Sequence, residues 1–423
     1  MAKRTKKTPL HAWHTARGAK MAAFAGYDMP LWYSSAKDEH LAVLTAAGMF
    51  DTSHMAVLMV NGPEALDLLQ WCFTNNLGAC MGPARKPLYP GSCVYGAFLN
   101  DKGEVIDDAI VFQTAANHYM VVVNAGMGAT LSAHLLRQAA GRAVAVHDLT
   151  DQVGKIDVQG PAAAKIVSGM LKASQNVFNA LPYFAFKGHF QANPPMPTAV
   201  LLRDGTPVLV SRTGYTGELG FELFVEARHT VAVWEALLAA GEPLGLIPCG
   251  LAARDSLRAG AVLPLSHQDI GPWPFINHPW PFALPYNEDR SAFTKNFLGA
   301  DALRANPDAD FTYPFVGRDL RKVTTDGKTR VLDSRGEAIG TVLTCATDMG
   351  IGTHEGRILS VASPDRPPGF KPKGLACGFV KVQKSLSPGD EVVISDQRRQ
   401  LPVTIVSDIR PDRTARRPLK ETL

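Results

Sequence analysis

The chain has 423 residues, enough for about three domains of ordinary size. Its composition, 46% hydrophobic and 19% charged, is typical of a soluble globular protein and excludes a disordered, collagen-like or coiled-coil chain. The formal net charge of +4 is too small over this length to predict nucleic-acid binding.

Membrane and metal signals are also missing from the sequence. No apolar run reaches the ~20 residues that a membrane-spanning helix needs, and the amino-terminal segment lacks the apolar stretch of a secretory signal. The cysteines show no CxxC spacing, which favours reduced thiols over disulfides or a zinc site. With no HxH or HExxH spacing either, we expect no metal. The sequence therefore predicts a cytoplasmic enzyme.

The first third of the chain alternates helix and strand patterns. An apolar strand at 56–60 ends in Asn-Gly-Pro, and the proline begins an amphipathic helix at 63–71. Strands at 92–99 and 105–112 flank an Asn-Asp-Lys-Gly turn, which is typical of a hairpin. The other predicted elements here are a helix at 38–47, a strand at 119–123 and a helix at 129–140.

A similar order of elements then recurs. A strand at 155–159 ends in Gly-Pro and precedes a helix at 161–171. The elements that follow are strands at 198–202, 208–212 and 221–225 and a helix at 230–240. Strand, Gly-Pro, helix and hairpin in both halves predict two related α+β units.

The last part of the chain has a different character. Residues 264–286 are too rich in proline and aromatic residues for a regular element. Beyond Phe315, apolar strand patterns occur at 337–345, 374–382, 391–394 and 401–406, with Gly or Pro between them. These patterns predict a small all-β terminal domain.

The segment RTGYTGELGFE, residues 212–222, is the most concentrated candidate for a binding site. Its three closely spaced glycines allow tight turns and a close approach of backbone to ligand, but their spacing is not that of a dinucleotide-binding loop. Glu222 lies in an apolar strand, where an ionised carboxylate needs partners. It could accept two parallel N–H bonds from a planar heterocycle; the alternative is an exposed Glu on a bulged hairpin.

Two further clusters carry candidate chemistry. Asp107 and Asp108 lie in the middle of the strand VIDDAIVF, where alternation turns one of them toward the core or a cavity. Such a carboxylate is a site candidate, although turn capping is an alternative. Arg254 and Asp255 lie on a helix, where the planar guanidinium suits either a bound carboxylate or a structural ion-pair network.

With these segments in view, the chain resembles the glycine-cleavage T-protein (aminomethyltransferase) family. The motifs GMFDTSHM, EVIDDAIVF, VVVNAG, VQGPAA, RTGYTGELGFEL and PCGLAARDSLR occur in the order that the family shows. The resemblance is strong over residues 8–263 and weak in the terminal β domain.

The resemblance implies a fold, a cofactor and a set of residues. We expect an interleaved two-subdomain α+β body at 1–314 and a β-barrel at 315–423, around a central funnel that holds tetrahydrofolate. Asp108 is then the catalytic carboxylate near the reactive N5/N10 edge, Glu222 binds the pterin, and Arg254 binds in the same site. The other implied folate-binding residues are Met55, Tyr95, Asp107, Asn124 and Tyr215.

The implied activity is aminomethyl transfer. A lipoyl carrier (H) protein delivers the aminomethyl group, and the products are 5,10-methylenetetrahydrofolate and ammonia. The chemistry rests on attack by folate N5 on an activated one-carbon group, accelerated by positioning and charge.

Departures from the family pattern keep a second activity open. The family's Gly-x-Asp-Ile/Leu-Asp-Glu stretch is replaced by residues 266–270, SHQDI, followed by a run of prolines and aromatics, which makes His267, Trp273 and Trp280 candidates for the substrate side. Aromatic rings attract sulfonium or ammonium groups by about 0.5–2 kcal/mol per contact. The alternative function is therefore a folate-dependent demethylase that acts on a small methylated sulfonium, ammonium or methoxy-aryl substrate and gives 5-methyltetrahydrofolate. Equally, these aromatics could pack the seam between domains.

A binding protein without turnover is a further class. The iron–sulfur-assembly branch of the same fold carries a Lys-Gly-Cys-Tyr-x-Gly-Gln motif, and no cysteine of this chain has that context.

Overall fold

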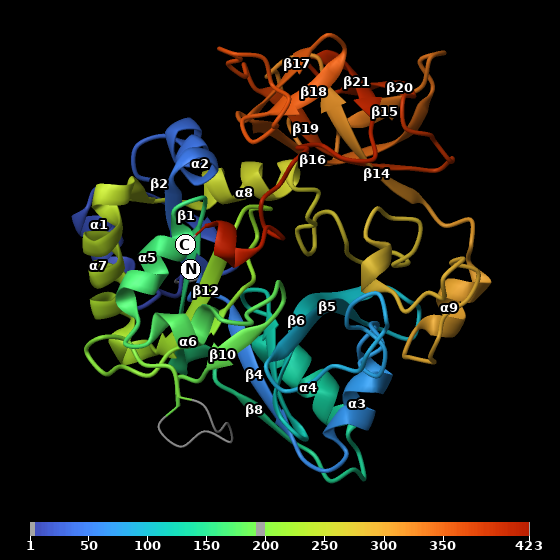
Figure 1. The fold of residues 1–423 in the computed structure, drawn as a ribbon. Coiled ribbons are helices and arrows are strands. Elements are labelled where there is room, and N and C mark those ends of the chain that lie inside the picture. The colour runs from blue at the N-terminus through green and yellow to red at the C-terminus, as the bar shows by residue number, and fades with distance from the viewer. Residues whose placement is uncertain (1–4, 192–198, 423) are drawn as a thin grey trace.

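A mixed α+β body carries a closed β-barrel on one side (Figure 1). The computed structural model describes residues 5–191 and 199–422. Within these ranges, no helix is both long and apolar enough to cross a membrane. The predicted fold class is confirmed.

One sheet of the body comes from a continuous stretch of chain. Its strands are β4 (Ala56–Asn61), β5 (Ser92–Leu99), β6 (Val105–Ala115), β7 (His118–Val123) and β8 (Ala145–Asp148), and its helices are α3 (Ala65–Cys72) and α4 (Gly128–Gln138). The strand order is β5-β6-β7-β4-β8. Apolar side chains of α3, α4 and one sheet face form a core around Phe73, Phe98 and Leu131.

The second sheet is built from two parts of the chain, one before and one after the segment that forms the first sheet. Its strands are β3 (Ala47–Asp51), β9 (Val153–Gln159), β10 (Phe186–Gly188), β11 (Leu209–Ser211), β12 (Gly220–Glu226) and β13 (Leu246–Pro248), and its helices are α5 (Ala163–Met170), α6 (Ser174–Phe178) and α7 (Thr230–Gly241). The order is β10-β11-β12-β9-β3-β13. Because β3 precedes the first sheet in the chain and β9 follows it, the subdomains are interleaved.

The two sheets repeat one arrangement. The order β5-β6-β7-β4 of the first returns as β10-β11-β12-β9 in the second. Gly62 and Gly160, which end β4 and β9, have φ values of +136° and +124°. A Cβ atom would lie 2.2 Å from the carbonyl oxygen of Ala143 at the first position and 2.6 Å from that of Val43 at the second. The Gly-Pro signal therefore marks a turn that requires glycine in both units.

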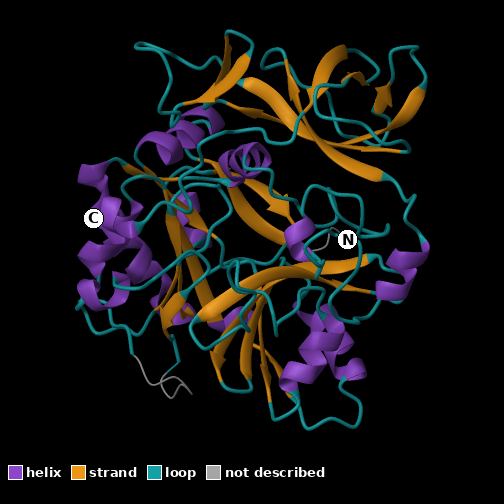
Figure 2. Ribbon diagram, turned by 45° about the vertical axis from the view of Figure 1, so that its right-hand side comes forward, coloured by secondary structure: helices purple, strands orange, loops and turns teal. Residues whose placement is uncertain are grey.

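Helices cover the outer sides of the two sheets, as Figure 2 shows. Between the sheets, apolar side chains from both form a shared core, in which the Phe112 and Phe224 rings lie 5.9 Å apart. This seam fixes the relative position of β6 and β12, the strands that carry Asp108 and Glu222.

The terminal domain is the predicted all-β unit. Strands β14 (Phe311–Gly317), β19 (Leu375–Val382), β16 (Ala338–Asp348), β15 (Arg330–Leu332), β20 (Glu391–Ser395) and β21 (Gln400–Ile405) close the barrel in that order, and β17 (Ile351–His354) and β18 (Arg357–Ser360) form a hairpin. Since β14 pairs with both β19 and β21, the barrel begins at Phe311. The expected boundary at 314/315 thus falls inside a barrel strand.

The remaining elements are α1 (His11–Ala16), β1 (Lys20–Phe24), β2 (Tyr27–Trp32), α2 (Ala36–Thr45), α8 (Leu251–Gly260) and α9 (Ala300–Ala305). Most of them lie around the second sheet and the junction with the barrel, whereas α9 packs beside the β5–β6 hairpin of the first sheet. Helix α8 lies beneath the barrel and contacts β16 (Figure 1).

A buried polar network fastens the barrel to the body. Asp348 of β16 accepts a hydrogen bond from His40 Nε2 of α2 at 2.9 Å and is ion-paired with Arg410 of the C-terminal segment. Arg410 also contacts Glu218. Although burial by itself raises the pKa of Asp348, Arg410 and His40 hold it well below its ordinary value. The C-terminal segment is thereby held against the loop that precedes β12.

Two segments bear on the predictions. Residues 264–286 are irregular apart from a short 3-10 helix (Pro281–Ala283), as their proline content predicts. The strand expected at 198–202 does not form: Leu201 and Leu202 make only isolated bridges, and Thr198 lies outside the described residues. The chain turns back at Gly205 (φ +95°) and leaves no room for a longer ladder.

Candidate active site

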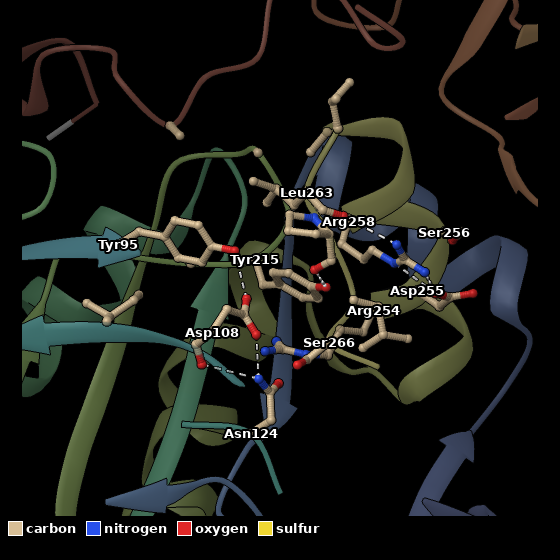
Figure 3. A pocket seen from close by; sticks show the side chains of 18 of the residues that line it. Tyr95, Asp108, Asn124, Tyr215, Arg254, Asp255, Ser256, Arg258, Leu263 and Ser266 are labelled. Atoms are coloured by element: carbon tan, nitrogen blue, oxygen red, sulfur yellow. Dashed lines mark hydrogen bonds and ion pairs between the residues drawn. The ribbon is translucent and has the colours of Figure 1, made fainter. Parts of the chain in front are cut away.

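A cavity of about 1740 Å³ opens where the two sheets, α8, the barrel and the C-terminal segment meet. Small-molecule sites commonly enclose ~300–1,000 Å³, so this cavity has room for a ligand and for a second reactant. Figure 3 shows the part of its wall around Asp108, Tyr215 and Arg254.

Asp107 and Asp108 are consecutive in β6, so their side chains leave the strand in different directions. Asp108 lines the cavity, whereas Asp107 is fully buried behind the wall. Asn124, at the end of β7, joins them, because its Nδ2 donates to Asp108 Oδ1 at 2.6 Å and to Asp107 Oδ1 at 2.8 Å.

Two hydroxyl groups also donate hydrogen bonds to the Asp107 and Asp108 carboxyl groups. Tyr95 of β5 donates to Asp108 Oδ2 at 2.8 Å, and Ser266 donates to Asp107 Oδ1 at 2.7 Å. Burial raises the pKa of both carboxyl groups, and the neighbouring Asp108 charge raises that of Asp107 further, while the hydrogen bonds lower both in part. The two carboxyls therefore titrate as a pair that keeps a proton above the usual range for Asp.

Glu222 lines the same cavity from the second sheet, on β12, and is 5% exposed. Its Oε1 lies 2.5 Å from Lys155 Nζ, and its Oε2 accepts the Thr213 hydroxyl at 2.5 Å. Lys155 is itself buried and also donates to Asp157 Oδ1 at 2.8 Å. The carboxylate is thus partnered, as burial requires.

Arg254 extends this cluster from α8. Its guanidinium donates to Asp157 Oδ2 at 2.8 Å and lies 4.8 Å from the centre of the Tyr215 ring. Burial favours the neutral form of Asp157, but Lys155 and Arg254 outweigh it and lower the pKa of this carboxyl. The positive charges of Lys155 and Arg254 therefore neutralise the negative charges of Asp157 and Glu222 beside the cavity.

Most of the predicted site residues converge on this cavity. Its lining includes Met55, Tyr95, Asp108, Asn124, Tyr215, Glu222, Arg254 and His267. Asp107, Trp273 and Trp280 are outside that lining.

Trp280 and Trp273 do not form a ligand-binding aromatic cluster. Trp280 is fully buried, donates its indole N–H to the Val262 carbonyl at 2.8 Å and packs on Phe379 of the barrel. Trp273 has the Lys381 ammonium 4.3 Å from its ring centre. Both side chains pack the seam between body and barrel, which is the alternative that the sequence left open.

Lys155 and Asp157 were not predicted from the sequence as site residues. They stand two residues apart in the strand VGKIDVQ, so both project from the same face, and every residue of this strand is buried. Charged residues alternating within a buried strand were the signal that could have found them. Arg413 and Arg416 of the C-terminal segment also line the cavity.

The fold and this cavity define a class of protein in which a large cavity lined by charged and polar side chains lies between two α+β units and a barrel. A family model described as "GCVT N-terminal domain" matches residues 10–273. The chain belongs to this family, the aminomethyltransferase (glycine-cleavage T-protein) family, so the predicted family is confirmed.

Individual relatives agree. An aminomethyltransferase of Streptomyces coelicolor is 41% identical over 265 residues, 63% of this chain and 65% of that protein. One from Shouchella clausii is 34% identical over 364 residues, 84% of this chain and 90% of that protein. The crystal structure of glycine cleavage system aminomethyltransferase T from Bartonella henselae superposes with a TM-score of 0.73 at 27% identity, covering 98% of this chain and 99% of that one. The predicted enzyme class is confirmed, and nothing among these relatives favours the demethylase alternative.

Proposed function

We propose that this protein is a tetrahydrofolate-dependent aminomethyltransferase of the glycine-cleavage type. The observation that carries the proposal is that Asp108 and Glu222, on two different sheets, line the same cavity. The relatives described above are aminomethyltransferases.

The residues of the cavity suit a reduced folate. A pterin offers adjacent N–H donors, and the wall supplies buried carboxylates together with the Arg254 and Tyr215 pair. His54, which also lines the cavity, has a buried Nδ1 with no hydrogen-bond partner among the described residues. An unpaired buried polar atom in a roomy, polar cavity is what a bound polar ligand would satisfy.

We assign the folate contacts to these side chains. Glu222 would accept pterin N–H donors, and Arg254 and Tyr215 would bind beside it. Tyr95, Asn124 and Met55 would contact the part nearer Asp108. When bound, tetrahydrofolate supplies the nucleophilic N5 that accepts the one-carbon unit.

Asp108 is the residue we assign to catalysis. Its carboxylate is held by the Tyr95 hydroxyl and the Asn124 amide, so its orientation is set before a ligand binds. In that position it would orient the reacting amine and stabilise positive charge that develops on the transferred group. Asp107, buried behind it, would support this position through the shared Asn124.

The donor we propose is an aminomethyl group on the lipoyl arm of a carrier protein, with ammonia and 5,10-methylenetetrahydrofolate as products. The two tryptophans that the sequence offered for a methylated onium substrate are not available to it, because Trp280 is buried and Trp273 has the Lys381 ammonium over its ring.

Product analysis tests the proposal. The protein is incubated with tetrahydrofolate and either an aminomethyl-lipoyl carrier or a panel of methylated osmolytes and methoxyarenes, and the folate product is identified by mass. We expect methylenetetrahydrofolate and ammonia, in the presence of the carrier only. Methyltetrahydrofolate formed without a carrier would reject the proposal.

A further inference from the structure

His267 occupies a distinctive place in the cavity. It lies in the irregular segment after α8, lines the cavity and keeps 49% of its side chain exposed. Its Nε2 lies 4.0 Å from Oδ1 of Asp107, which is itself buried behind the wall. The imidazole therefore lies near Asp107 and also faces the space that a ligand would enter.

The backbone at His267 is strained. Its φ of +61° is in the left-handed region, which a side chain beyond Cβ disfavours and glycine does not. Such strain persists only where the surrounding structure enforces it, and it is concentrated at functional sites.

Here the residues on both sides of His267 enforce the strained conformation. Ser266 is held by its hydrogen bond to Asp107, and the Gln268 amide donates to Thr344 Oγ1 at 2.7 Å in the barrel. Asp269 accepts the Thr344 hydroxyl at 2.6 Å and is ion-paired with Arg258. His267 is the residue between these anchors whose side chain is left free to meet a ligand.

We propose that His267 is a catalytic acid–base residue that carries a proton between the Asp107–Asp108 pair and the reactants in the cavity. This inference rests on the proposed function. Imidazole accepts and releases protons near neutral pH, and Asp107 lies 4.0 Å from the His267 ring nitrogen Nε2.

The proton balance of the proposed transfer requires such a group. Forming the methylene bridge makes two C–N bonds, to N5 and N10, and breaks the C–S and C–N bonds of the aminomethyl donor. Two N–H protons are released from the acceptor nitrogens, and one proton is gained by the leaving amine and one by the leaving sulfur. No oxidant or reductant is needed, so a single group that takes up and returns protons closes the balance.

Several ionisable groups on the surrounding elements lie around the part of the cavity where His267 would transfer a proton. They are Asp107 and Asp108 on β6, Tyr95 on β5, Tyr215 before β12, Arg254 and Arg258 on α8, and Asp269 in the same segment. Arg258 is paired with Asp255 and Asp269, and Arg254 with Asp157. The Asp107–Asp108 pair is therefore the nearest negative charge that His267 meets.

Two substitutions at this position separate strain from chemistry. His267→Gly removes both the imidazole and the backbone strain. It is expected to raise Tm, measured without folate, while lowering kcat by about 10²–10⁴-fold, and added imidazole should restore part of kcat. His267→Gln keeps a polar side chain and the strained backbone, so it should lower kcat without raising Tm and without rescue.

A matched control lies outside the cavity. Arg290 has φ +59° on an exposed turn, so Arg290→Gly should also raise Tm but leave kcat unchanged.

These measurements can either support or overturn the proposed role of His267. Wild-type kcat in His267→Gly, or a loss of kcat that imidazole does not restore, would overturn it. If wild-type protein makes no methylenetetrahydrofolate, the proposed function fails and this inference fails with it, whereas normal turnover in both the wild type and His267→Gly overturns this inference alone.

Discussion

Lys155 and Glu222 form a buried ion pair, 2.5 Å between Nζ and Oε1, in the wall of the cavity. Lys155 is 2% exposed, and its other partners are Asp157 and the Thr52 hydroxyl. The residue that we expect to bind the pterin is thus positioned by a cation on the neighbouring strand. Removal of this cation would leave two carboxylates competing for Arg254.

Lys155→Met should destabilise the protein strongly. The substitution leaves Glu222 as a buried charge without its cation and Asp157 with Arg254 alone. Breaking a buried pair in this way commonly costs about 3–5 kcal/mol. The free energy of unfolding from urea titration measures this loss. Adding Glu222→Gln should recover part of it, because that uncompensated charge is then removed.

Lys165, exposed on α5, provides the control for that experiment. Lys165→Met should change the free energy of unfolding by no more than about 0.5 kcal/mol. A loss of that small size for Lys155→Met as well would mean that the pair makes no net contribution.

Asp108→Asn should abolish turnover and leave folate affinity close to that of the wild type. The amide keeps the shape of the side chain but cannot stabilise positive charge, a loss we place at about 10²–10⁴-fold in kcat. Steady-state kinetics and calorimetric titration with tetrahydrofolate measure the two quantities. Wild-type turnover in this variant would remove Asp108 from the mechanism.

Glu222→Gln should weaken folate binding instead. Pterin N–H donors would lose a charged acceptor, which costs about 1–3 kcal/mol in binding free energy. Glu226, on the same strand but paired with Arg228 at the surface, is the control, and Glu226→Gln should bind folate normally. Equal affinities for the two variants would contradict the pterin role of Glu222.

Stability should fall as pH rises through the titration of Asp107 and Asp108. Burial raises the pKa of Asp107 to about 7, above the ~3.9 of an unfolded Asp. Between those values the native state binds more protons than the unfolded state, so the free energy of unfolding decreases with pH.

Asp107→Asn removes one titrating carboxyl and should flatten that decrease. Urea titrations of both proteins at several pH values between 4 and 8 measure the difference, for which ~1.4 kcal/mol per pH unit per proton is the upper limit. Parallel curves for the two proteins would show that Asp107 has no raised pKa.

Much of the fold was predictable from local patterns. The hairpin strand expected at 92–99 is β5, and the Gly-Pro turns after β4 and β9 begin the two repeated units. Period-two alternation and turn residues act over a few positions, so neighbours in the chain are enough to specify them. The expected strand at 198–202 does not form, because the chain turns at Gly205 directly after it and Leu201 and Leu202 make only isolated bridges.

The site was predictable only in part. Motifs that resemble the family pointed to Asp108, Glu222 and Arg254, and all three line one cavity. Lys155 and Asp157 have no such signal, and their roles follow from contacts with Glu222 and Arg254, far away in the chain. Trp280 looked like a ligand-binding aromatic, but it packs against Phe379 of the barrel.

The sequence by itself therefore determined the elements, the repeat, the family and the chemical types available for catalysis, because these depend on spacing and on side-chain chemistry. Tertiary structure decided which charged groups neutralise one another and which aromatic side chains pack in the core. It also decided which residue at the cavity has a strained backbone. Those properties depend on distances between segments that are remote in the chain, and burial and charge act through those distances.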